Sequence, residues 1–268
     1  MSYNIAVCIK PVPDPDFYDK ITIDPRTKRI TRSGIPAVIN PADKNAVEAA
    51  LEIKEKYGGK VTVITMAPPN AEENMREVLA MGADAAYILS DREFGGADTL
   101  ATSYTLAQGL KKIGPFDIII TGTESADGAT TQVPAQLAQW LEIPHLWGVK
   151  KIEFINETEL KVRAKIEGGS IEYFIKLPAL LAVSREINRP RYTTIMGIKG
   201  AKKKPLTIYG VKDIDIDLNN IGLKGSPTQA GAVNVPSIDR KCKKLRGEPD
   251  EIADLLIREL TAAGIPLE

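Results

Sequence analysis

Short apolar runs alternate with helical patterns along the first half of the chain. Each run has the length of a strand and is apolar or β-branched. Each segment that follows has apolar residues at the spacing of an amphipathic helix. This alternation is typical of a doubly wound, mostly parallel sheet and predicts an α/β fold. The expected strands are residues 4–9, 60–66, 85–89 and 117–121, and the expected helices are residues 43–53, 72–81, 98–113 and 130–141.

The pattern changes after these elements. Residues 160–166 and 171–177 alternate apolar and polar side chains around a Gly168-Gly169 turn, which predicts an antiparallel hairpin. Residues 179–184 are a further apolar run, expected to form a buried strand. The polar stretch 14–34 is expected to be an excursion from the sheet, with a small hairpin formed by residues 21–24 and 29–31.

The last third of the chain lacks periodicity until its end. From Arg189 to about Pro249, Lys, Pro and Gly are frequent, so this stretch is expected to be disordered or to lie as an extended arm on a partner. We therefore expect an α/β domain over residues 1–190, followed by a partner-docking loop, an arm and a C-terminal helix over residues 191–268. The closing helix, residues 250–263, has Ile252, Leu255, Leu256 and Leu260 on one face.

Composition narrows the classes of function. The chain has 268 residues with 35 basic and 35 acidic side chains, so its formal net charge is zero, which argues against nucleic acid as the main ligand. No apolar run exceeds five residues, which excludes a membrane span, and no signal peptide is recognised. The two cysteines, Cys8 and Cys242, are expected to be reduced thiols in a cytoplasmic protein without a structural metal site.

Candidate chemistry lies in the loops that follow the predicted strands, because ligands of doubly wound sheets lie beyond the carboxyl ends of the strands. Neither G-x-G-x-x-G nor G-x-x-x-x-G-K-[ST] occurs in the chain. Gly95-Gly96-Ala97-Asp98 is expected to deliver Thr99 and Thr102 to a helix N-terminus, where backbone amides can face an anion.

The loop over residues 122–132 leaves a predicted strand, is rich in hydroxyls and enters a helix. It is either a helix start capped by Thr130 or Thr131, or a phosphate cradle of amides and hydroxyls. Ser125 does not lie in a G-x-S-x-G motif, and the only histidine, His145, follows a proline in an expected loop. A Ser-His-Asp triad is therefore not expected, and no catalytic acid, base or nucleophile is assigned.

Several segments together resemble the β subunit of electron transfer flavoprotein. The resemblance covers nearly the whole chain, in order and at the spacing of that family. It implies a Rossmann-like, adenine-nucleotide-binding sheet in a chain that pairs with an α subunit carrying an FAD. The segments are Val7-Cys8-Ile9-Lys10, Asn40-Pro41-Ala42-Asp43 with residues 46–50, Met81-Gly82-Ala83-Asp84, residues 122–132, and Pro190-Arg191-Tyr192-Thr193 with residues 201–204.

By this resemblance the chain holds either a structural AMP or, in the electron-bifurcating branch, a second FAD that takes a hydride from NADH. Residues 94–103 and 127–133 reproduce the patterns typical of that branch, which favours FAD. Where relatives usually have Arg or Lys followed by Gln-Ala-Ile, this chain has Thr123-Glu124-Ser125-Ala126 and so lacks a positive charge near the cofactor. The resemblance places the nucleotide against Cys8, Asn40, Pro41, Asp43, Met66, Thr99, Thr102, Gly122, Ser125, Asp127, Gly128, Thr130, Thr131, Gln132 and Val133.

The resemblance also implies electron partners. One electron would pass to ferredoxin and the other, through the FAD of the α subunit, to an acyl-CoA dehydrogenase-type enzyme. An apolar tip within a basic surround suits transient, electrostatically steered docking on such an enzyme. Two alternatives stay open: a conventional carrier with AMP in this subunit, and a stand-alone adenine-nucleotide-binding module. The expected docking residues are Arg191, Tyr192, Ile195, Met196, Lys202 and Lys203.

Overall fold

The structure is a computed structural model that describes residues 2–14, 16–17, 22–24, 29–31, 34–229 and 242–266. It divides into two compact units, Met1–Gly231 and Ala232–Glu268. The first unit contains the sheet, and the second contains helix α6 (Pro249–Ala262). The boundary between these compact units lies at residues 231–232, whereas the sequence led us to expect a boundary at residue 190.

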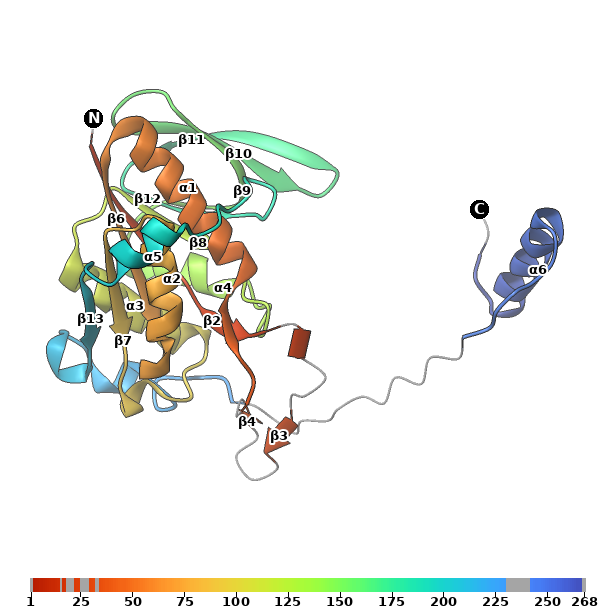
Figure 1. Ribbon diagram of the computed structural model, residues 1–268, viewed down its shortest axis with the longest axis horizontal. Helices are drawn as coiled ribbons and strands as arrows, with labels where there is room; N and C mark the ends of the chain where they lie inside the picture. Colours follow the sequence, from red (N-terminus) through yellow and green to blue (C-terminus); the bar gives the residue numbers. More distant parts are fainter. Residues whose placement is uncertain are drawn as a thin grey trace. The chain divides into compact units, whose positions relative to one another are not determined.

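A nine-stranded sheet forms the centre of the first unit, in the order β11-β10-β9-β12-β8-β1-β6-β7-β13 (Figure 1). Its central strands are all parallel, as the alternation of strands and helices predicts. The predicted doubly wound, mostly parallel α/β fold is confirmed. The parallel core consists of β12 (Ala179–Val183), β8 (Ile118–Gly122), β1 (Tyr3–Cys8), β6 (Gly59–Met66) and β7 (Ala85–Leu89).

An antiparallel extension continues the sheet at one end. β10 (Glu159–Ile166) pairs with β11 (Gly169–Lys176) in the predicted hairpin, and also with β9 (His145–Phe154). β9 in turn runs parallel to β12. The predicted hairpin is therefore confirmed, and it is joined to the parallel core through β9.

Helices cover both faces of the parallel core (Figure 1). α1 (Pro41–Tyr57) and α2 (Glu72–Met81) pack on one face, and α3 (Thr99–Ile113) and α4 (Gln132–Leu141) pack on the other. Successive side chains of β1 enter opposite layers: Ile5 and Val7 join the first core cluster, and Ala6 and Cys8 join the second. Because both faces are covered, the last four residues of β1, from Ile5 to Cys8, form an unbroken apolar run rather than an alternating pattern.

Short elements fill the connections. The excursion after β1 carries two antiparallel pairs, β2 (Pro11–Pro13) with β5 (Ala37–Ile39), and the predicted hairpin of β3 (Thr22–Asp24) with β4 (Arg29–Thr31). Ile21, which we expected to begin that hairpin, lies outside the described residues. Single 3₁₀ turns occupy Pro69–Ala71, Arg92–Phe94, Val211–Asp213 and Leu218–Asn220. In the described parts of the chain, no helix is long and apolar enough to cross a membrane.

The expectation that residues 189–249 lack a core of their own is wrong for residues 192–229. Helix α5 (Ile195–Ala201) packs on α2, and β13 (Leu206–Tyr209) extends the sheet in parallel beside β7. Ile214 and Ile221 are buried in the core cluster on the α3 and α4 face. A four-residue strand and two isolated apolar side chains are too sparse to produce a period, so the sequence pattern missed them. Residues 230–241 lie outside the described residues.

In its described residues, 242–266, the second unit contains one amphipathic helix. Helix α6 begins with Pro249 at its first position, and the backbone N–H of Glu248 donates to the carboxylate of Glu251 in a capping-box arrangement. The predicted helix over residues 250–263 is confirmed to within one residue at each end. Described side chains of α6 are not buried, and Leu255, Leu256 and Ile257 are all exposed. Its apolar face therefore has no cover within the unit described.

Candidate functional site

Asn40 fixes the loop that follows β8. Its side-chain amide donates to the carbonyl oxygen of Glu124 at 2.8 Å and accepts from the backbone N–H of Ala126 at 3.0 Å. Because these bonds occupy both ends of the amide, Asn40 precedes α1 without capping it. Only 2% of Asn40 is exposed, so its amide bonds the loop from the buried side.

Asp43 joins the ends of β1 and β8. One carboxylate oxygen accepts from the backbone N–H of Lys10 at 2.7 Å, and the other accepts from that of Gly122 at 3.1 Å. Gly122 is required here, because a β-carbon would lie 2.4 Å from the carboxylate. Asp43 lies inside the first turn of α1, and its carboxylate bonds backbone amides outside the helix. Burial raises the pKa of Asp43 to about 7, against the effect of both hydrogen bonds.

Lys10 binds the loop that follows β8. Its ammonium lies 2.6 Å from the carboxylate of Asp127 and 3.3 Å from the hydroxyl of Ser125. The side chain of Asp127 is nearly buried, whereas that of Lys10 is about half exposed. Sequence reasoning missed Lys10 as a site residue, although its position directly after β1, at the carboxyl edge of the sheet, was a usable signal.

The start of α4 presents backbone amides without a side-chain cap. Its N-cap residue is Thr131, but the Thr131 hydroxyl donates to the carbonyl oxygen of Thr130 instead of capping the helix. Ala129 and Thr131 both have positive φ, at 45° and 59°. A non-glycine residue in this region is strained, and such strain concentrates at ligand-binding loops. The geometry favours the cradle interpretation of residues 122–132 over the capped helix start.

The cradle extends to the start of α3. The hydroxyl of Thr99 donates to the side-chain oxygen of Gln132 at 2.8 Å, so the first residues of α3 and α4 are directly joined. Thr102 lies about one turn further along α3 and is half-buried. Gly128, Thr130 and Thr131 lie on the exposed turn before α4, while Val133 packs against the core.

A cavity of about 420 Å³ opens beside Lys10 at the ends of β1 and β6. Met66 lines it, together with apolar and proline-rich segments. Cys8 does not line it, because its thiol belongs to the core, where burial and, less strongly, the Asp43 carboxylate raise its pKa. Pro41 is the first residue of α1. The lining consists of Lys10, Pro11, Val12, Pro13, Ile35, Pro36, Ala37, Met66, Ala67, Pro68, Pro69, Asn70, Ala71 and Asn74.

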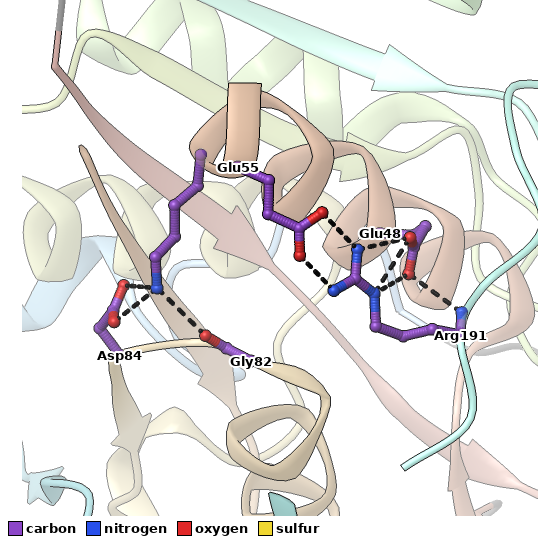
Figure 2. A network of polar contacts seen from close by, with 6 residues as sticks. Glu48, Glu55, Gly82, Asp84 and Arg191 are labelled. Atoms are coloured by element: carbon purple, nitrogen blue, oxygen red, sulfur yellow. Dashed lines mark hydrogen bonds and ion pairs between the residues drawn. The ribbon is translucent and has the colours of Figure 1, made fainter. Parts of the chain in front are cut away.

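A second feature lies on the α1 and α2 face of the sheet, where Arg191 clamps the segment before α5 to α1. Its guanidinium bridges the carboxylates of Glu48 and Glu55, and its backbone N–H donates to Glu48 at 3.0 Å (Figure 2). These bonds, first to Glu55 and then to Glu48, raise the pKa of Arg191. Nearby, Lys54 of the same helix binds Asp84 and the carbonyl oxygen of Gly82 (Figure 2).

The segment that Arg191 anchors carries the expected docking tip. Tyr192, Ile195 and Met196 are 95%, 75% and 77% exposed, although all three are apolar or aromatic. The Thr194 hydroxyl accepts from the backbone N–H of Gly197 and caps α5. Lys202 and Lys203 are exposed just after the helix. The apolar tip is therefore bonded to α1 through Arg191 and has basic neighbours.

Replacing Arg191 with Lys is expected to loosen this attachment. Lys keeps the charge but cannot bond two carboxylates with a planar fork, so we expect a loss of about 1–2 kcal/mol. Hydrogen–deuterium exchange of the amides of residues 192–198 should then be roughly tenfold faster. The matched control is Arg163→Lys, because Arg163 pairs with Glu172 on the exposed hairpin. Equal exchange in Arg191→Lys and the unmutated chain would contradict the anchoring role.

The fold and these loops define a doubly wound α/β protein with polar loops and an uncapped helix start at the carboxyl ends of its parallel strands. The Electron transfer flavoprotein domain matches residues 27–214. The Electron transfer flavoprotein subunit beta of Thermoanaerobacterium thermosaccharolyticum is 44% identical over 260 residues, 97% of this chain and 98% of that protein. Caffeyl-CoA reductase-Etf complex subunit CarD of Acetobacterium woodii is 46% identical over 227 residues, 84% and 85% of the two chains. Protein FixA of Azorhizobium caulinodans is 38% identical over 265 residues, 96% and 93% of the two chains.

These matches cover most of the chain at high identity, and the chain belongs to the electron transfer flavoprotein family. Its relatives at this identity include β subunits, so the resemblance drawn from the motifs is confirmed. Its role is electron transfer.

Proposed function

We propose that this chain is the β subunit of a heterodimeric, electron-bifurcating electron transfer flavoprotein and holds an FAD. When bound, the flavin would accept a hydride from NADH and pass electrons to ferredoxin and, through an FAD of the α subunit, to an acyl-CoA dehydrogenase-type enzyme. The uncapped start of α4, together with the preceding loop in which Ser125 and Asp127 bind the ammonium of Lys10, is the observation that carries the proposal.

The residues present fit a dinucleotide. The amides at the start of α4 and the hydroxyls of Thr130 and Thr131 suit phosphate oxygens, because a helix N-terminus favours anions. The cavity between the ends of β1 and β6 is lined mostly by apolar and proline residues, which suits a flat heteroaromatic base. The link between Thr99 and Gln132 brings the start of α3 to the cradle, which favours a ligand longer than a mononucleotide.

In this proposal the chain's own residues bind and orient rather than react. Asn40 and Asp43 hold the loops from beneath, through backbone amides and carbonyls, so we assign them to positioning rather than to direct contact with the nucleotide. Lys10 supplies positive charge beside Asp127. The Cys8 thiol is buried and its raised pKa keeps it protonated, so it has no nucleophilic role.

The partner proposal rests on two exposed features. CarD is named as a subunit of a reductase complex, and several relatives are named as β subunits. In this chain the exposed tip at Tyr192, Ile195 and Met196 suits transient docking on an acyl-CoA dehydrogenase-type enzyme. The uncovered face of α6 suits a more permanent contact with the α subunit.

Introducing a charge at the tip is expected to slow electron delivery. In Ile195→Glu, a carboxylate would have to be desolvated at the contact, so we expect the second-order rate with the dehydrogenase to fall by roughly 10–30-fold. Nucleotide content should not change, because the tip lies on the other side of the sheet from α3 and α4. The matched control is Ile155→Glu, at another exposed isoleucine. Loss of nucleotide from Ile195→Glu would count against the docking assignment.

The proposed function is tested with the purified α/β complex under anaerobic conditions. We expect steady-state turnover of NADH, beyond the first reduction of the flavin, to require ferredoxin and the dehydrogenase acceptor together, because the two electrons leave by separate routes. A complex that accepts electrons only from a dehydrogenase, and never from NADH, would instead be the conventional carrier with AMP. Tight ATP binding by a monomer of this chain would indicate the stand-alone nucleotide-binding module.

A further inference from the structure

Asp98 joins two distant parts of the first unit through separate carboxylate oxygens. Oδ1 accepts from the backbone N–H groups of Leu100 and Ala101, at 2.9 and 3.1 Å, and so caps α3. Oδ2 accepts from the backbone N–H of Thr228 at 3.0 Å and from its hydroxyl at 2.7 Å. The backbone N–H of Asp98 donates to the Ser226 hydroxyl at 2.8 Å. The end of the first unit is thus bonded directly to the cap of α3.

Residues 221–228, the segment that reaches Asp98, pack closely on the loop before α3. Ile221 is buried in the same core cluster as Phe94, and the backbone N–H of Leu223 donates to the carbonyl oxygen of Gly95 at 3.1 Å. Gly222 has a φ of +54°, and a β-carbon there would lie 2.0 Å from the carbonyl oxygen of Glu93. No other residue fits this close approach. Residues 221–228 therefore sit on the loop before α3 in one defined way.

A continuous series of contacts leads from residues 221–228 to the cradle. Asp98 caps α3, Thr99 is the first residue of α3, and Thr99 bonds Gln132 at the start of α4. Although burial alone would raise it, the hydrogen bonds from Thr228 and from the α3 amides hold the pKa of Asp98 below its ordinary value. The carboxylate is therefore charged at neutral pH, and its hydrogen bonds are charge-assisted.

We propose that Asp98 is a positioning residue, through which residues 221–228 hold the α3 side of the nucleotide cradle in place. That this cradle binds a nucleotide rests on the proposed function. The Thr228 contact can be tested separately from the helix cap, because Thr228 donates to Oδ2 whereas the cap of α3 is made by Oδ1. Its removal should therefore loosen the start of α3 without removing the cap.

The test compares Thr228→Val, which removes the hydroxyl, with Thr228→Ser, which restores it. The matched control is Thr158→Val, because the Thr158 hydroxyl also donates to a side-chain oxygen but lies in the β9–β10 turn. That turn contacts Tyr3 at the start of β1, at the opposite edge of the sheet from the cradle. Two quantities are measured on the α/β complex: amide exchange at Leu100 and Ala101, and the dissociation constants of FAD and AMP.

In Thr228→Val we expect exchange at Leu100 and Ala101 to be about five- to tenfold faster and nucleotide affinity to fall about three- to tenfold. Thr228→Ser and Thr158→Val should match the unmutated complex. Unchanged exchange in Thr228→Val would overturn the proposal. If the unmutated complex held neither FAD nor AMP on this chain, the proposed function would fail, while the exchange result would still decide the positioning role. If Thr228→Val fails to fold, Ser226→Ala, which removes the acceptor for the Asp98 N–H, replaces it with the same expected exchange.

Discussion

Removal of residues 250–268 is expected to weaken the heterodimer of this chain with its α subunit by at least about a hundredfold. Helix α6 carries Ile252, Leu255, Leu256 and Leu260 on one face, and none of its described side chains is buried. Burial of such side chains against a partner contributes about 1.5–3 kcal/mol each before the costs of association are subtracted. Because the sheet lies in a separate compact unit, the truncated chain should keep its thermal unfolding midpoint.

The measurement is the dissociation constant of the α/β pair for the full and the truncated chain. A point variant, Leu256→Asp, should reproduce much of the loss by placing a charge on the apolar face of α6. Asp254→Asn, which changes an exposed polar side chain of the same helix, serves as the matched control. A truncated chain that still pairs with full affinity would contradict the role given to α6.

The second large effect concerns Asp43 and pH. Burial raises the pKa of this carboxyl to about 7, whereas in the unfolded chain it is expected near 4. Between these values the folded state holds a proton that the unfolded state has released, so the free energy of unfolding falls as pH rises. The fall is at most about 1.4 kcal/mol per pH unit, and over the whole window it amounts to roughly 4 kcal/mol. Below pH 4 and above pH 7 this contribution to the slope disappears.

Urea unfolding of the purified chain between pH 4 and 8 measures this slope. In Asp43→Asn the side chain does not titrate. The free energy of unfolding should therefore fall less steeply between pH 4 and 7, by up to about 1.4 kcal/mol per pH unit, which corresponds to one proton. Thr121→Val is the matched control, because it alters a buried polar side chain of the neighbouring strand without removing a titratable group. Identical slopes for Asp43→Asn and the unmutated chain would show that Asp43 is not the group responsible.

Periodicity predicted the parallel core and its covering helices because those segments bury long, regular faces. The strands of the core are apolar on both sides, and helices such as α2 carry their apolar residues on one face. The same reasoning failed for β13, Ile214 and Ile221, which are short or isolated in sequence. Their burial depends on surfaces built by β7 and α3, and no local pattern encodes those surfaces.

The family motifs indicated which segments lie near one another, but not the contacts that their side chains make. The loop over residues 122–132 and the Asn-Pro-Ala-Asp segment were recognised as neighbours from the motifs they share with the family. That Asn40 and Asp43 bond loop amides, and that Lys10 reaches Asp127, depends on side-chain directions fixed by tertiary structure. The contact of Thr228 with Asp98 spans 130 residues of sequence, and no motif connects the two.

The nucleotide content of the purified α/β complex tests the central claim most directly. After gel filtration and denaturation, chromatography of the released cofactors counts FAD and AMP per heterodimer. The proposed function predicts two FAD and no AMP, together with reduction of flavin by NADH before any acceptor is added. One FAD with one AMP per heterodimer, and no reduction by NADH, would contradict it.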